Sequence, residues 1–239
     1  MRVLAVIPSR YDSSRFPGKP LIDLAGKTMI QRVYEGVRKS DLISKVIVAT
    51  DDQRIFDEVN SFKGQVMMTS KEHLNGTGRC AEVCRQLENY DLIINVQGDE
   101  PLIQSAQLDT LVHAFDDPTV EIATLAMPNI SSDDIANSNR IKVVLDCNRD
   151  ALYFSRSPIP NTEKTSDKVI SMKHIGIYAF RRLALLETQD MKACAPEIAE
   201  SLEQLRWMYY GKKIRVVETR IETPNIDSPE DVEKVLRLL

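Results

Sequence analysis

The chain has few of the residues that mark several protein classes. Its 239 residues include three histidines, one tryptophan and four cysteines, and the cysteines lack CxxC pairing. Zinc ribbons need cysteines in paired CxxC spacing, and disulfide scaffolds need a higher density of cysteines. No apolar run approaches the roughly 18 to 20 residues of a membrane-spanning helix, and the short apolar N-terminus has no small-residue cleavage site after it. We therefore expect no membrane partner, and we interpret the first apolar run as a buried strand.

Excess positive charge is also missing. The chain has 31 Lys and Arg against 35 Asp and Glu, which gives a formal net charge of −4. Nucleic-acid-binding proteins are usually basic, so we expect no nucleic-acid partner. Cys80 and Cys84 have the spacing of two small apolar side chains on one helix face. Unpaired cysteines favour a reducing, cytoplasmic location.

Short apolar runs alternate with amphipathic segments in the first half of the chain. Ile30, Val33 and Val37, for example, share one face at helical spacing. Buried strands that alternate with helices predict a mostly parallel sheet flanked by helices. The expected strands are 3–7, 46–50, 65–69, 92–97 and 122–127, and the expected helices are 29–39, 53–62, 79–88 and 105–115.

The second half contains more strand patterns. Its expected strands are 141–145, 152–155, 174–180 and 213–219, and its expected helices are 196–210 and 229–239. Both helices have Pro and an acidic residue in the first turn, which is a typical start signal. Because no linker or repeat separates the halves, we expect a single α/β domain over residues 1–239 with a β-rich extension.

A basic loop follows the first strand. Arg10, Arg15 and Lys19 outnumber Asp12 there, in a chain that is acidic overall. Ligands of open parallel sheets bind at the carboxyl ends of the strands, so this loop is suited to phosphate. A solvated basic loop is the alternative, and the segment matches neither the P-loop nor the Rossmann pattern.

Two carboxylate segments are candidates for a metal site. Asp99 lies just past the strand 92–97 and is a candidate ligand of Mg²⁺, although an ordinary strand-ending turn explains it equally well. In the segment before the last helix, Ser228 with Glu230 and Asp231 is typical of a helix cap. Asp227 is left over by that account and becomes the candidate second ligand.

His174 opens the strand 174–180. His174, Gly176 and Tyr178 alternate on one face, and with Arg156 they could bind a hydroxylated acid. His113 is expected on the surface. The segment 75–79 is a turn opening a helix, whose amides either meet a nucleotide or cap the helix.

Nine segments in order resemble the 3-deoxy-manno-octulosonate (Kdo) cytidylyltransferase family from Val6 to about Val232. They are V-I-P-S-R-Y-D-S-S-R-F-P-G-K-P-L, V-A-T-D-D, N-G-T-x-R, N-V-Q-G-D-E-P, K-V-V-L-D, A-L-Y-F-S-R-S-P-I-P, K-H-I-G-I-Y-A-F, L-E-Q-L-R and I-D-S-P-E-D. The resemblance implies a nucleotide-diphospho-sugar transferase fold, a homodimer, and the reaction of CTP with Kdo to give CMP-Kdo and pyrophosphate with Mg²⁺, for lipopolysaccharide biosynthesis.

The resemblance also implies the site residues. The triphosphate would be held by Arg10, Arg15 and Lys19, and the cytidine would lie by Gln97 and the turn near Thr77. Mg²⁺ would be bound by Asp99 and Asp227. The sugar acid would be surrounded by Arg156, His174, Tyr178, Glu203 and Gln204. Arg10, Lys19 and Asp99 are the expected catalytic residues. Because the reaction brings two anions together, positive charge is its main requirement.

One position departs from the family, which commonly has an acidic residue where this chain has Gly78. Two alternatives remain open. The substrate could be the 8-amino analogue of Kdo or a sialic acid, or the chain could be a CTP-binding regulatory module without turnover. Asp99 and Asp227 argue against the regulatory module, because the basic loop alone would bind CTP.

Overall fold

The structure is a computed structural model that describes the chain except for residues 13–15, 129, 165–169 and 227. Its internal contacts divide the chain into two compact units. Unit 1 comprises Met1–Asp109 and Thr223–Leu239, and unit 2 comprises Thr110–Glu222. The single domain expected over residues 1–239 stays a prediction.

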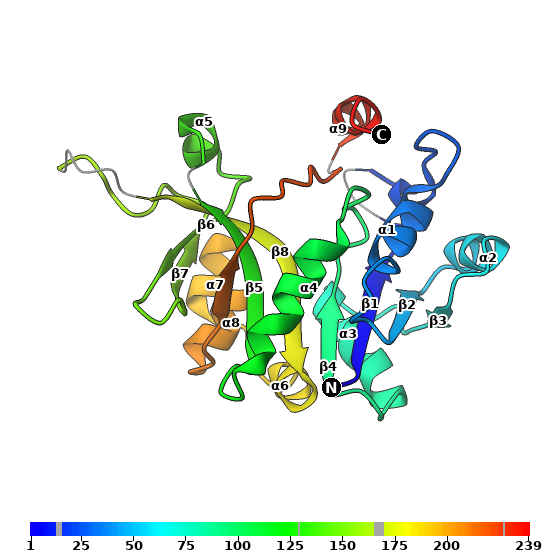
Figure 1. Ribbon diagram of the computed structural model, residues 1–239, viewed down its shortest axis with the longest axis horizontal. Coiled ribbons are helices and arrows are strands. Elements are labelled where there is room, and N and C mark those ends of the chain that lie inside the picture. Colours follow the sequence, from blue (N-terminus) through cyan, green and yellow to red (C-terminus); the bar gives the residue numbers. More distant parts are fainter. Residues whose placement is uncertain (13–15, 129, 165–169, 227) are drawn as a thin grey trace. The chain divides into compact units, whose positions relative to one another are not determined.

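Unit 1 is built on a parallel sheet (Figure 1). Strand β1 (Val3–Ser9) pairs in parallel with β2 (Lys45–Thr50) and β4 (Leu92–Asn95), and β2 pairs in parallel with β3 (Val66–Met68). The first five residues of β1 are all buried, as a central strand covered on both faces requires. The parallel sheet with flanking helices that the sequence predicts is confirmed.

The helices of unit 1 start at polar caps. The helices are α1 (Met29–Val37), α2 (Gln53–Ser61), α3 (Gly76–Gln86) and α9 (Pro229–Leu236), with a 3₁₀ turn η1 (Lys19–Leu21). Thr28, Asp52 and Asn75 each accept a hydrogen bond from the first turn of α1, α2 and α3. Cys80 and Cys84 are free and buried on α3, as predicted. Helix α4 (Ser105–His113) spans the change from unit 1 to unit 2, and His113 is exposed, as predicted.

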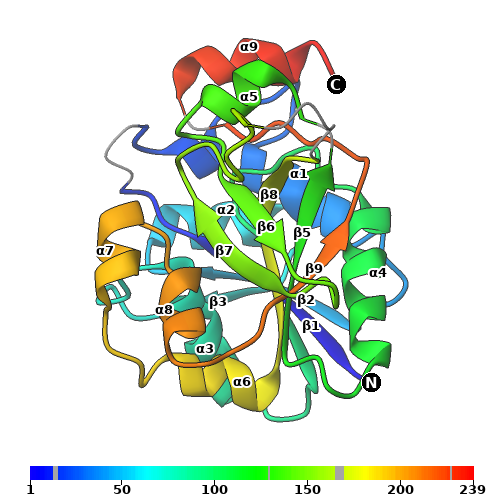
Figure 2. The ribbon, with the colours of Figure 1, turned by 90° about the vertical axis from the view of Figure 1, so that its left-hand side faces the viewer.

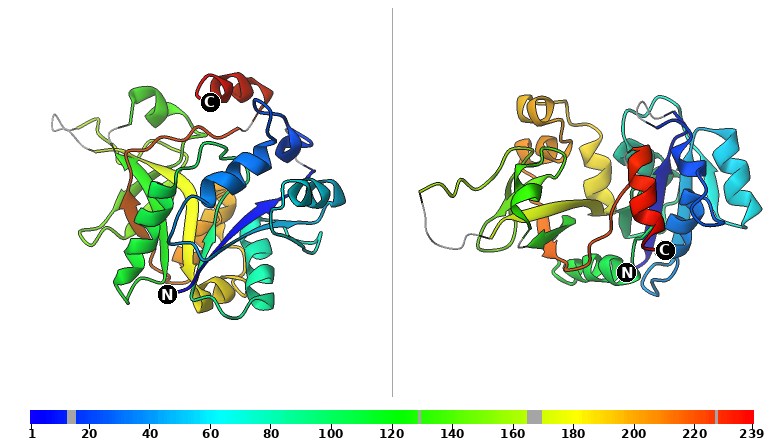
Figure 3. Two further views of the ribbon diagram at one scale, coloured as in Figure 1. Left: turned by 45° about the vertical axis from the view of Figure 1, so that its right-hand side comes forward. Right: turned by 90° about the horizontal axis from the view of Figure 1, so that it is seen from above.

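The C-terminal segment belongs to unit 1 through a small apolar cluster. Ile226 and Val235 are fully buried with Leu24 and Met29, and Figure 3 shows α9 beside the N-terminal part of the chain. The cap predicted at Ser228 is present, since its backbone N–H donates to Asp231 Oδ2 at 3.1 Å. This cluster fixes the chain just before residue 227.

Unit 2 is largely antiparallel (Figure 2). Strand β5 (Ile122–Pro128) pairs antiparallel with β8 (Met172–Arg181) and parallel with β9 (Arg215–Glu218). The hairpin of β6 (Lys142–Leu145) and β7 (Ala151–Ser155) joins β8 through β6. The β-rich second half is therefore confirmed. The remaining elements are a 3₁₀ turn η2 (Ala114–Asp116) and the helices α5 (Ser132–Ala136), α6 (Arg182–Thr188), α7 (Ala195–Glu200) and α8 (Gln204–Tyr209).

The single helix predicted over 196–210 is wrong. The segment forms α7 and α8, which are separated at Ser201, whose φ of 52° lies in the left-handed region that ends helices. The apolar periodicity continues across the break, so it did not reveal it. The short helices α5 and α6 were not predicted, because five and seven residues carry too little periodicity. Along the described parts of the chain, no helix combines the length and apolar character that crossing a bilayer requires.

Candidate functional site

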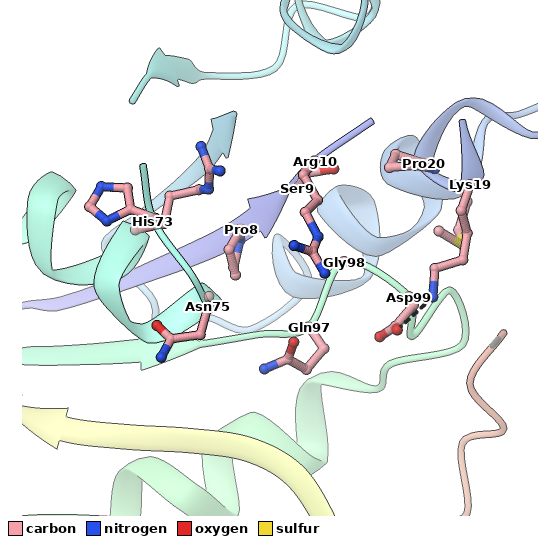
Figure 4. Close-up of a pocket in the computed structure, with 13 residues that line it drawn as sticks. Pro8, Ser9, Arg10, Lys19, Pro20, His73, Asn75, Gln97, Gly98 and Asp99 are labelled. Atoms are coloured by element: carbon pink, nitrogen blue, oxygen red, sulfur yellow. Dashed lines mark hydrogen bonds and ion pairs between the residues drawn. The ribbon is translucent and has the colours of Figure 1, made fainter. Parts of the chain in front are cut away.

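A cavity of about 240 Å³ lies in unit 1 at the carboxyl ends of β1 and β4. Figure 4 shows Arg10, Lys19, Asn75, Gln97 and Asp99 around it. Arg10 directly follows β1, Lys19 begins η1, and Asn75 caps α3. The structure therefore brings the basic loop and the predicted metal ligand Asp99 to one cavity. Arg15 lies outside the described residues.

Lys19 and Asp99 form the central ion pair of the cavity. Lys19 Nζ donates to Asp99 Oδ2 at 2.8 Å and to the carbonyl oxygen of Ile226 at 2.7 Å. Both side chains remain partly accessible, at 13% and 26%. The ammonium is thus held at the cavity by the residue that follows a strand end and by the C-terminal segment.

The neighbouring Glu100 is in a different electrostatic state. Burial raises the pKa of Glu100 to about 8, and the Asp99 carboxylate adds to the rise, while a hydrogen bond from Thr223 lowers it. Glu100 is therefore mostly protonated at pH 7. Of these two adjacent carboxyl groups, Asp99 is the one that lines the cavity and can offer charge to a cation.

Two glycines allow the strand ends to approach each other closely. A Cβ on Gly98 would lie 3.0 Å from the carbonyl oxygen of Pro8, and a Cβ on Gly76 would lie 2.9 Å from the ring of Pro8. Two buried polar atoms at these strand ends, Ser9 Oγ and Asn95 Oδ1, have no hydrogen-bond partner within the described residues. Ser9 lines the cavity, so its hydroxyl could form a hydrogen bond with a ligand there.

Some residues at the cavity were not among the predicted site residues. Arg79 is buried on α3, where it pairs with Asp51 at 2.9 Å and donates to Thr69 Oγ1 at 2.5 Å. His73 Nε2 lies 2.5 Å from Glu82 Oε2. His73 and Arg79 both line the cavity, as Gln97 does, whereas Thr77 is buried beside the lining residue Gly76. The spacing around 75–79 signalled a turn but not these ion pairs, which join separate segments.

The predicted sugar-acid residues lie in unit 2 and are connected there. The rings of His174 and Tyr178 are 5.3 Å apart, and Tyr178 Oη is buried. Burial, together with the charge of Glu203, raises the pKa of Tyr178 well above its usual value. Glu203 and Gln204 stand at the start of α8. Tyr178 therefore remains a neutral hydroxyl beside an acidic side chain.

His174 is held as a neutral ring. Its Nε2 lies 2.9 Å from Thr124 Oγ1, and the Thr124 hydroxyl donates its proton to the carbonyl oxygen of Ile177 at 2.8 Å. Because a hydroxyl has one proton, the hydrogen-bond pattern assigns the ring proton to Nε2 and leaves Nδ1 as an acceptor. Burial lowers the pKa of His174 to about 3. A neutral acceptor of this kind suits a sugar hydroxyl.

Trp207 is a further residue of this cluster that the sequence did not indicate. Its ring meets Tyr178 and Phe180 edge-on at 5.1 and 5.2 Å, and its Nε1 is buried without a partner in the described part of the chain. Tryptophan at a helical apolar position is typical of a core residue, so the sequence pattern does not single it out. Trp207 packs against the face of β8 that carries Tyr178.

Of the two predicted Mg²⁺ ligands, Asp99 lies among the described residues and Asp227 does not. Among the described residues, no group of three or more His, Cys, Asp or Glu side chains could hold a metal ion. Asp99 has the carboxylate chemistry that Mg²⁺ prefers, and its carbonyl oxygen accepts from the backbone N–H of Ile226 at 3.0 Å. Asp227, the next residue in sequence, lies outside the described residues.

A parallel sheet with a cationic cavity at its carboxyl end is typical of nucleotide-binding transferases. Residues 4–214 match the family described as Cytidylyltransferase, and the chain belongs to this family of nucleotidyltransferases. Its relatives are named more narrowly. Proteins of Parabacteroides distasonis and Fusobacterium nucleatum, both named 3-deoxy-manno-octulosonate cytidylyltransferase, are 49% and 46% identical over all of this chain and 98% and 97% of their own length.

Solved structures agree with the family. A CMP:2-keto-3-deoxy-manno-octonic acid synthetase complexed with CTP matches with a TM-score of 0.95 and 45% identity, over all of this chain and 98% of its own. A cytidylyltransferase from Leptospira borgpetersenii shares the fold, with a TM-score of 0.65 at 18% identity over 99% of this chain and 85% of its own. The transferase fold class predicted from the sequence is thereby confirmed.

Proposed function

We propose that this chain transfers the cytidylyl group of CTP to 3-deoxy-manno-octulosonate and releases pyrophosphate. The observation that carries the proposal is the cavity at the ends of β1 and β4, where Arg10, Lys19, Gln97 and Asp99 line one space. High identity to relatives of that name over their full length supports the choice of sugar.

The cations of unit 1 act on the triphosphate. Arg10 and Lys19 bind its oxygens, and Arg15 is proposed as a third cation. When the anomeric oxygen of the sugar forms its bond to the α-phosphorus, the bond from that phosphorus to the pyrophosphate oxygen breaks. Lys19 and Arg10 stabilise the charge that collects on the departing pyrophosphate. The hydroxyl proton leaves to solvent, so the proposal requires no side-chain nucleophile.

The polar residues of unit 2 act on the sugar acid. Arg156 binds its carboxylate, and Nδ1 of His174 accepts from a sugar hydroxyl. Tyr178 offers its hydroxyl, while Glu203 and Gln204 add polar groups at the start of α8.

Asp99 and Asp227 are the residues proposed to hold Mg²⁺. When bound, the ion would neutralise phosphate charge and lower the pKa of the attacking hydroxyl. Asp99 fits this role because its side chain lines the cavity, whereas Glu100 is buried. A homodimer, a cytoplasmic location and a role in lipopolysaccharide biosynthesis belong to the proposal on the strength of the sequence resemblance.

We predict pyrophosphate release when the purified chain is given CTP, 3-deoxy-manno-octulosonate and Mg²⁺. Asp99→Asn removes the carboxylate charge and should lower turnover by roughly 100-fold or more, with an unchanged circular dichroism spectrum. Asp57→Asn, at an exposed position on α2, is the matched control and should retain wild-type turnover.

A competition assay determines which sugar acid is the preferred substrate. The 8-amino analogue and a sialic acid are assayed beside 3-deoxy-manno-octulosonate, and preferred turnover of either would replace the proposed substrate. Binding of CTP with no turnover of any of the three acids would instead favour a regulatory module. Near-normal activity of Asp99→Asn would remove that carboxylate from the mechanism.

A further inference from the structure

Arg156 has an unusual set of partners for a partly buried arginine. Its guanidinium donates to three backbone carbonyl oxygens, those of Glu200 at 2.6 Å, Ser138 at 3.1 Å and Ser201 at 3.4 Å. None of the partners of the guanidinium within the described residues is a carboxylate. Arg206 and Arg215, by contrast, each pair with acidic side chains in the same unit. The charge of Arg156 is therefore oriented but not neutralised.

A count of the N–H donors of the guanidinium shows which of them have no partner among the described residues. Arginine has five N–H donors in a fixed plane, and the three carbonyl oxygens take one donor each. One N–H on each terminal nitrogen is left over within the described part of the chain, which is the arrangement that binds a carboxylate through two parallel hydrogen bonds. Arg156 is thus prepared for a planar anion, provided that its plane is fixed.

The backbone of Arg156 is fixed by the carboxylate of Glu200. Glu200 Oε1 accepts from Ser155 Oγ at 2.7 Å, and Oε2 accepts from the backbone N–H of Arg156 at 2.9 Å. Lys142, which is fully buried, donates to the carbonyl oxygen of Arg156 at 2.6 Å. Both sides of the Arg156 backbone are therefore held by charged groups from other elements.

The break between α7 and α8 supplies the guanidinium acceptors. Because the helix ends at Glu200 and Ser201 takes a left-handed conformation, their carbonyl oxygens are not committed to a continuing helix. Both oxygens accept from Arg156 instead. The chain then turns into α8 at Glu203 and Gln204. One residue, Glu200, thus ties the end of β7 to the segment that carries two further proposed sugar contacts.

We propose that Glu200 is a positioning residue for the sugar acid. Its carboxylate clamps the Ser155–Arg156 segment, and its carbonyl oxygen orients the guanidinium, so that the two remaining N–H groups of Arg156 meet the carboxylate of the sugar. Glu200 itself touches no substrate. This inference rests on the proposed function, because it assumes that Arg156 binds the sugar acid.

The test compares steady-state kinetics of four chains. Glu200→Gln keeps one acceptor oxygen and places an amide donor against Ser155 Oγ or Arg156 N–H, and it should raise KM for 3-deoxy-manno-octulosonate roughly tenfold. We expect kcat and KM for CTP to change less than threefold. Ser155→Ala removes one of the two clamp bonds and should raise the sugar KM two- to threefold.

Glu197→Gln is the control on the same helix. Glu197 pairs with Arg206, and among the described residues it shares no hydrogen bond with Arg156. Its variant therefore tests whether loosening α7 by itself raises the sugar KM. A sugar KM raised equally by Glu197→Gln, or one unchanged in Glu200→Gln, would overturn the positioning role, as would a parallel rise of KM for CTP. A wild-type chain that does not turn over the sugar acid would overturn the proposed function and this inference with it, and that result is separate from a failure of the variants alone.

Discussion

At the scale of single residues, burial decides which groups carry charge. His174 is kept neutral by its surroundings of Phe154, Tyr178 and Thr124, and Glu100 is protonated at pH 7 next to a charged Asp99. The residues that flank His174 and Glu100 in the sequence do not indicate that these two side chains are neutral. The difference arises because desolvation disfavours the charged form of each group.

The neutrality of His174 has a consequence for acid stability. In the unfolded chain its pKa returns to about 6.5, whereas the folded chain holds it at about 3. Between these values the unfolded state binds the additional proton, so stability rises with pH from about 3 to about 6.5 and is constant above that range. Acidification therefore destabilises the fold through this residue.

We predict that His174→Gln weakens this dependence. Between pH 7 and pH 4.5, the variant should lose about 2 to 3 kcal/mol less free energy of unfolding than the wild type. Urea denaturation at the two pH values measures the difference, and His113→Gln at the surface is the control. Equal losses for His174→Gln and the wild type would mean that the imidazole is already protonated in the fold.

At the scale of elements, helix ends place the functional groups. Helix α3 begins at the cavity because Asn75 caps it, with Oδ1 accepting from the backbone N–H of Gly78 at 2.8 Å. Helices α7 and α8 are separated at Ser201, and the backbone carbonyl oxygens of Glu200 and Ser201 accept hydrogen bonds from Arg156. In both cases the polar groups that end a helix also shape a binding site.

The cap of α3 can be tested by substitution. Asn75→Ala should lower the free energy of unfolding by about 1 kcal/mol, because the first turn loses its side-chain acceptor. Asn75→Ser keeps an acceptor and should recover most of the loss. Equilibrium urea denaturation compares the three chains, and equal stability of the alanine variant and the wild type would mean that the cap contributes nothing.

At the scale of the whole molecule, the distribution of charge matters more than its sum. The chain is acidic by four charges, yet Arg10, Lys19 and Arg79 line one cavity in unit 1. Arg79 and Lys19 pair with Asp51 and Asp99, whereas Arg10 is exposed. A polyanion that binds there should stabilise the folded chain through linkage.

We predict that CTP raises the melting temperature. At about 100 times its Kd, the ligand adds about 2.7 kcal/mol, which corresponds to roughly 5 to 10 °C for a chain of this size. Arg10→Ala should reduce the shift at the same CTP concentration, while Arg237→Ala, which changes the exposed arginine just after α9, should not. Differential scanning fluorimetry measures the shifts, and an undiminished shift in Arg10→Ala would place the triphosphate elsewhere.

The sequence by itself determined the alternation of strands and helices, the β-rich second half, the basic loop and the family, because these depend on local periodicity and on ordered motifs. Tertiary structure alone decided the pairing of Lys19 with Asp99, the neutral states of Glu100 and His174, and the clamp of Glu200 on Arg156. Each of these depends on groups far apart in the chain and on the water that folding removes from them. The end of α7 at Ser201 has the same cause, since its carbonyl oxygens are satisfied by an arginine 45 residues away in sequence.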